Sequence, residues 1–118
     1  MRRSLIFSLF AVASLSRCDS QAPPSNSVAI AQASTVEPSD ERLATLYKQS
    51  CKACHSIPNG AAPLVQDRSQ WDARWGKGLP VLLQSTINGL NGMPPGGQCF
   101  SCSVKDYEAL IRFLAGQP

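Results

Sequence analysis

The sequence predicts a small all-α domain over residues 39–118, built from helices and loops. Two patterns of Ser followed three residues later by Asp predict helix starts, at Ser69/Asp72 and Ser103/Asp106. After the second start, apolar residues recur with the i, i+3, i+4, i+7 spacing of an amphipathic helix, at Tyr107, Leu110, Ile111 and Leu114. The alternation that is typical of a half-buried strand is found nowhere in the sequence, so the domain is predicted to lack a sheet.

The helices are expected in a fixed order. The first begins at residues 39–41, where Asp40 and Glu41 complement the helix dipole, and runs into residues 51–55. The second runs from residue 69 to the glycines at 76 and 78. The third begins at Pro80, which suits a first helical turn, and ends near Asn88–Gly89. The fourth ends at Gly116.

The first helix leads into a Cys-x-x-Cys-His motif formed by Cys51, Cys54 and His55. This motif is the attachment signature of c-type haem. Two cysteines three positions apart lie on one helix face, where both thiols can form thioether bonds to the porphyrin. The next residue, His55, can then bind the iron from the proximal side. The motif predicts one covalently bound haem c per chain.

Met93 is the expected second axial ligand of the haem iron. It is the only methionine beyond the initiator, as His55 is the only histidine. A lone methionine is more often core filler. Here it stands in a loop of glycines and prolines, which offers few packing partners and a stiff backbone.

The cysteines admit two other interpretations. Cys51, Cys54, Cys99 and Cys102 could form a four-thiolate zinc site, but this leaves His55 and Met93 unexplained. A redox-active Cys-x-x-Cys pair is the second alternative. It requires a βαβ context, which the sequence does not provide.

The N-terminal segment resembles an export signal. Residues 1–17 begin with two arginines, Arg2 and Arg3, followed by the apolar run 5–15, which is too short to span a bilayer. Cys18 is the cysteine left over by spacing and is expected to be lipidated, although Arg17 departs from the usual pattern before such a cysteine. The alternative is cleavage after Ala31, in an A-x-A pattern. Residues 18–38 are rich in Ser, Pro and Ala and are predicted to form a flexible tether.

The charge balance gives no indication of a nucleic-acid partner. The formal net charge is +3, and removal of residues 1–17 with their three arginines leaves eight basic and eight acidic residues. Such a nearly neutral domain lacks the basic patch that nucleic-acid binding requires.

Over about its last eighty residues, and most clearly from Cys51 onward, the sequence resembles the cytochrome c₅-type proteins, a group of small class I c-type cytochromes. The resemblance rests on the haem motif, on Ala62-Pro63, on Trp71-x-x-Arg74 and on Met93-Pro94-Pro95, with Asp67, Gly78, Gly89, Gly97 and Cys99-x-x-Cys102. It departs from the family pattern at Gly96, where many relatives have a basic residue, and at Trp75, where a smaller apolar residue is usual.

The resemblance implies a small class I cytochrome c fold wrapped around the haem, and three features of the site. Cys99 and Cys102 are expected to form a disulfide after the methionine loop. The Pro63 carbonyl is expected to accept a hydrogen bond from the His55 ring, which would fix its orientation. Trp71 and Arg74 share a helix face and could donate to the haem propionates, with a plain core role as the alternative for Trp71.

With both axial positions filled, the expected function is single-electron transfer between redox proteins, without a small-molecule substrate and without catalysis. The alternative is a haem-based sensor or a peroxidase-like protein, in which a labile Met93 would open the iron. The expected location is the bacterial periplasm, with a lipid anchor at Cys18 in the inner membrane.

Overall fold

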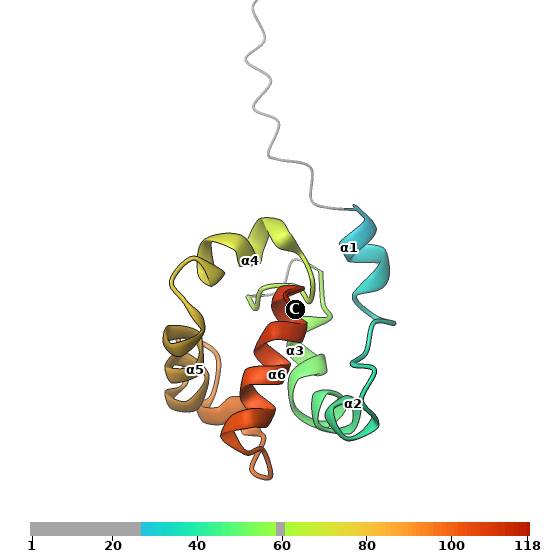
Figure 1. The fold of residues 1–118 in the computed structure, drawn as a ribbon. Helices are drawn as coiled ribbons and strands as arrows, with labels where there is room; N and C mark the ends of the chain where they lie inside the picture. The colour runs from blue at the N-terminus through green and yellow to red at the C-terminus, as the bar shows by residue number, and fades with distance from the viewer. Residues whose placement is uncertain (1–26, 59–60) are drawn as a thin grey trace, which may run out of the picture.

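The computed structural model describes residues 27–58 and 61–118 (Figure 1). Its helices are α1 (Ser27–Gln32), α2 (Glu41–Leu46), α3 (Lys52–His55), α4 (Arg68–Trp75), α5 (Leu79–Asn88) and α6 (Val104–Ala115). A π-helical turn, Tyr47–Cys51, joins α2 to α3, and a 3₁₀ turn, Pro95–Gln98, precedes α6. The described residues form no strand beyond an isolated bridge between Leu90 and Met93. The predicted all-α class is confirmed.

Helix α6 is the centre of the domain, in contact with α2, α4 and α5 (Figure 1). Its stripe of Leu110, Leu114 and Ala115 is buried in the core. Ser103 and Asp106 form the predicted capping box, and Gly116 ends the helix in the left-handed conformation. The start and end of α6 are therefore set by the residues that the sequence indicated.

The helix that carries the haem motif packs directly on α6. Tyr47 is fully buried, and its ring meets the Phe113 ring edge to face at 5.0 Å between centroids. At the start of α2 the capping residue is Asp40, which accepts a hydrogen bond from the Leu43 N–H. The packing of Tyr47 against Phe113 of α6 fixes the direction in which the haem motif follows α2.

The capping box predicted at Ser69 and Asp72 is wrong. Helix α4 begins at Arg68, and its cap is Asp67, whose carboxylate accepts from the backbone N–H and the hydroxyl of Ser69. The Asp72 carboxylate accepts from Arg68 instead. Asp67 is buried and also accepts a hydrogen bond from the Gln70 amide, whereas Ser69 is exposed. The buried, bonded carboxylate is therefore favoured as the capping group of α4.

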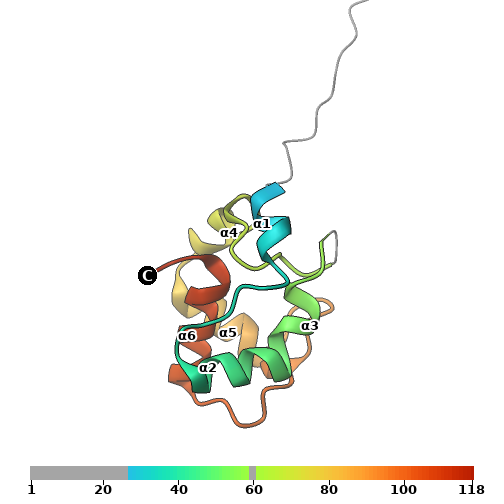
Figure 2. The ribbon, with the colours of Figure 1, turned by 90° about the vertical axis from the view of Figure 1, so that its right-hand side faces the viewer.

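The predicted tether is partly ordered. Residues 27–32 form α1, and Ala29 and Ala33 are buried in the core cluster. Glu37 forms ion pairs with Lys48 and Lys52, which hold the next segment against the motif helix. Figure 2 shows this segment crossing from α1 to α2. The segment folds because small apolar residues fit against the core, a fit that composition does not reveal. The predicted signal peptide and Cys18 lie outside the described residues.

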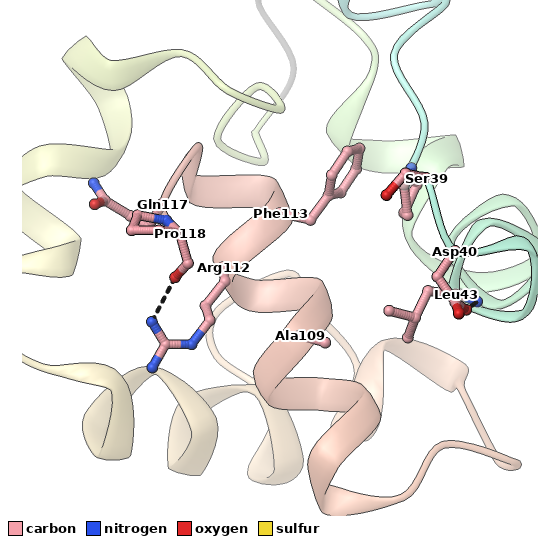
Figure 3. A pocket seen from close by; sticks show the side chains of 9 residues that line it. Ser39, Asp40, Leu43, Ala109, Arg112, Phe113, Gln117 and Pro118 are labelled. Atoms are coloured by element: carbon pink, nitrogen blue, oxygen red, sulfur yellow. Dashed lines mark hydrogen bonds between the residues drawn. The ribbon is translucent and has the colours of Figure 1, made fainter.

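A groove of about 320 Å³ separates the start of α2 from α6 (Figure 3). Leu43 lines one side, and Phe113 and Arg112 line the other. Arg112 donates a hydrogen bond to the Pro118 carbonyl at 2.7 Å. None of the haem-motif residues lines this groove, so it is separate from the site described below.

Candidate haem site

The haem motif is presented on a single helical stretch. Cys51 ends the π-helical turn, and Cys54 and His55 lie in α3. Both cysteines are free thiols, Cys51 partly buried and Cys54 exposed. Burial raises the pKa of the Cys51 thiol to about 11, so it is protonated at neutral pH. Both thiols are thus unpaired, as thioether formation requires.

His55 is buried and held by a single hydrogen bond at its ring. Its Nδ1 donates to the Pro63 carbonyl at 2.7 Å, which confirms the predicted bond. None of the described residues is bonded to Nε2. Burial lowers the pKa of His55, so the ring is neutral at pH 7 and its Nε2 carries a lone pair. A neutral imidazole fixed in this tautomer is suited to bind a metal.

The Trp71 ring lies beside the His55 ring. The two rings stack with centroids 6.0 Å apart and planes inclined by 28°. The Trp71 indole N–H donates to the Leu64 carbonyl at 2.8 Å. Because this donor is already bonded inside the core, the structure favours the core role for Trp71, and a role of its N–H toward a haem propionate stays a prediction. Arg74 is exposed and donates to the Gln70 carbonyl, and its role toward a propionate stays a prediction.

The methionine loop is held by close backbone contacts. Leu90 and Met93 exchange two backbone hydrogen bonds of 3.1 and 2.9 Å. Gly89 has φ +82°, and a Cβ there would lie 2.8 Å from the Met93 carbonyl oxygen. A Cβ on Gly97 would lie 3.3 Å from the Met93 Cε. Glycine at both positions therefore lets the loop fold closely around Met93.

The cysteine pairing settles the competing uses. Cys99 and Cys102 form the expected disulfide, with Cα atoms 5.4 Å apart. A four-thiolate zinc site is therefore excluded, because two of its thiols are in the disulfide. Cys51 and Cys54 lie on one continuous helical stretch of the described chain and not in a βαβ unit, which removes the basis for the redox-pair alternative.

The residues present fit a haem. Helix α5 is apolar, yet none of its side chains is buried among the described residues. Leu82 and Leu83 are half-buried and Val81 and Ile87 are exposed, beside the turn that follows Met93. A helix of this composition normally buries an apolar face. The open face, the two thiols and the neutral imidazole together match what haem c needs.

The sequence did not indicate the structural roles of Leu64, Asp67 and Gln70, although Asp67 belongs to the family resemblance. Leu64 accepts from Trp71 through its carbonyl and donates its N–H to the Gln70 side chain at 2.9 Å. Asp67 anchors Gln70 and the start of α4. An Asp two residues before Ser69, followed by an amide side chain, is the one signal that pointed to this network. Leu64 acts through its backbone, for which side-chain patterns carry no information.

An all-α domain with a neutral, carbonyl-bonded histidine directly after paired thiols is the arrangement of the c-type cytochromes. Comparison with known proteins agrees. Residues 38–114 match the family model described as cytochrome C oxidase, cbb3-type, subunit III. The chain belongs to this family of cytochromes c and is a cytochrome c₅-type protein.

Three relatives illustrate the likeness. Cytochrome c5 of Azotobacter vinelandii is 40% identical over 68 residues, which is 56% of this chain and 82% of that protein. Cytochrome c5 of Ectopseudomonas mendocina is 35% identical over 73 residues, covering 60% and 84%. Cytochrome c-555 of Chlorobaculum tepidum is 28% identical over 75 residues, covering 60% and 69%. The protein is a mono-haem electron carrier with one covalent haem c.

Proposed function

We propose that this protein transfers single electrons between other redox proteins, with His55 and Met93 as the two axial ligands of the haem iron. Iron bound by an imidazole and a thioether exchanges one electron and has no open position for a substrate. The observation that carries the proposal is the hydrogen bond from His55 Nδ1 to Pro63, which leaves Nε2 as the lone-pair nitrogen.

The surroundings of Met93 favour a carrier over a sensor or a peroxidase-like protein. A sensor would need Met93 to leave the iron readily. Here the Met93 backbone is bonded to Leu90 on both sides, and Gly89 and Gly97 lie against the Met93 carbonyl and Cε. Such close packing resists displacement, because movement of Met93 would break these contacts. The apolar side chains of α5 would exclude water from the same side.

The ferric absorption spectrum of the exported, haem-loaded protein tests this ligation. A weak band at about 695 nm reports a methionine–iron bond. We expect the wild-type protein to show it and Met93→Ala to lose it. Phe100→Ala is the matched control, because Phe100 is almost fully exposed close after the same loop and should leave the band unchanged. A wild-type protein without the band would contradict the proposed ligands.

We further propose that the domain works in the bacterial periplasm, anchored through a lipid on Cys18. Cleavage after Ala31 would remove Ala29 from the core cluster, so the packing of α1 favours processing farther upstream. The described residues contain no helix long and apolar enough to cross a membrane. A tether would keep the domain concentrated near membrane-bound redox partners. The intact mass of the mature protein is the test, and an unmodified N-terminus at Gln32 would contradict the anchor.

A further inference from the structure

Tyr107, in the first turn of α6, reaches back to the segment that follows Met93. Its hydroxyl donates to the Cys99 carbonyl at 2.8 Å. The same carbonyl accepts a weaker bond of 3.2 Å from the Cys102 N–H. Gly96 faces the hydroxyl so closely that a Cβ there would lie 2.6 Å from it. Tyr107 therefore contacts the 3₁₀ turn at two places, on either side of Gly97.

These two contacts are connected to Met93 through the backbone of the turn. The Cys99 N–H donates to the Gly96 carbonyl at 3.0 Å, and the Gly97 N–H donates to the Pro94 carbonyl at 2.9 Å. Gly97 lies between the two contacts, and a Cβ on it would lie 3.3 Å from the Met93 Cε. The turn is thus a short, bonded path from the Tyr107 hydroxyl to the thioether end of Met93.

We propose that Tyr107 is a positioning residue for Met93, and that its hydroxyl holds the turn 95–98 in the place where Met93 can remain on the iron. The inference rests on the proposed ligation by Met93 and assigns the residue that maintains it. The disulfide restrains the Cys99 side chain, while Tyr107 bonds the Cys99 carbonyl and also contacts Gly96, which lies nearer to Met93 in the chain. Loss of the hydroxyl frees one of two bonds at Cys99 and removes the atom that fills the space beside Gly96.

The test uses the haem-loaded, full-length protein with the variants Tyr107→Phe and Tyr47→Phe. Tyr47 is the matched control, because its buried hydroxyl has no hydrogen-bond partner among the described residues. Imidazole is the probe, since it binds ferric iron only when Met93 has left. Its apparent affinity therefore reports the fraction of molecules in the open state. The band at about 695 nm is recorded in parallel.

Loss of one hydrogen bond predicts that Tyr107→Phe binds imidazole about three- to tenfold more tightly and shows a weaker band near 695 nm. Tyr47→Phe should stay within about twofold of the wild type, because no bond is lost. If the wild-type protein shows the band but Tyr107→Phe and Tyr47→Phe bind imidazole with the same affinity, the inference is overturned. The proposed function is then left intact. A wild-type protein without the band would overturn both.

Gly96→Ala provides a second variant, which tests the same contact from the side of the turn. Its methyl group would collide with the Tyr107 hydroxyl and displace it, so imidazole affinity should rise as in Tyr107→Phe. In the Tyr107→Phe background the oxygen is absent, and adding Gly96→Ala should then raise the affinity by a smaller factor than it does alone. Equal factors in the two backgrounds would show that the alanine acts only through its strained backbone, and would contradict the role of Tyr107.

Discussion

Replacement of Trp71 by phenylalanine should destabilise the protein far more than replacement of its neighbour Trp75. Trp71→Phe removes the indole N–H that donates to the Leu64 carbonyl at 2.8 Å. One lost internal hydrogen bond costs about 0.5–1.5 kcal/mol, and the carbonyl keeps only its 3.1 Å bond from the Asp67 N–H. The smaller ring also leaves space beside His55, which costs a further 1–2 kcal/mol or so. The expected loss is about 1.5–3.5 kcal/mol.

Urea unfolding of the haem-loaded protein gives the free energy of unfolding, provided that the slope m is unchanged. Trp75→Phe is the matched control on the same helix. Trp75 is only partly buried and lies under the Arg112 guanidinium at 5.6 Å, so its replacement should cost no more than about 1 kcal/mol. The reduction potential should change little in either variant.

Two results would refute this reasoning. Equal losses of stability for Trp71→Phe and Trp75→Phe would show that the Leu64 bond and the packing against His55 contribute nothing particular. A large change in potential with little loss of stability would instead indicate that the Trp71 N–H acts on a haem propionate.

Three further predictions concern the loop, the cap and the N-terminal segment. Gly89→Ala should weaken the band at about 695 nm, because the added Cβ meets the Met93 carbonyl and the backbone at φ +82° is unfavourable for alanine. Arg42 holds the pKa of Asp106 below its usual range. The ionised carboxylate therefore stabilises the fold at every pH above the pKa that Asp106 has in the unfolded chain. This contribution is lost as the pH falls through the lower pKa of the folded protein. Asp106→Asn should therefore lower stability at pH 7 and flatten its acid limb in urea titrations from pH 7 downward, and an unchanged limb would contradict the pairing. Ala33→Asp should detach α1 and expose residues 27–38 to limited proteolysis while the ferric spectrum is retained, because Ala33 is fully buried.

The parts of the fold that the sequence predicted well are those set by local side-chain patterns. The capping box at Ser103 and the apolar stripe of α6 specify that helix without reference to the rest of the chain. Pro80 and Gly89 bound α5 in the same way. The haem motif was recognisable because covalent attachment fixes both residue type and spacing.

The parts that were wrong depend on burial, which no local pattern reports. Ser69 and Asp67 are both good caps by residue type, and only the buried network around Gln70 selects Asp67. Residues 27–36 are predicted to be a tether because small residues are common both in linkers and in tightly packed cores, so composition does not distinguish the two. The partner of the Trp71 indole N–H also depends on burial, because the fold brings the Leu64 carbonyl within hydrogen-bond distance of it.

The central claim is that Cys51 and Cys54 hold one haem covalently. The most direct measurement is the intact mass of the exported protein after denaturation and extraction with acidified organic solvent. We expect a polypeptide that keeps the mass of one haem through this treatment, and a bare polypeptide when Cys51 and Cys54 are both changed to alanine. A wild-type chain recovered at the mass of the bare polypeptide, with all haem in the organic phase, would contradict it.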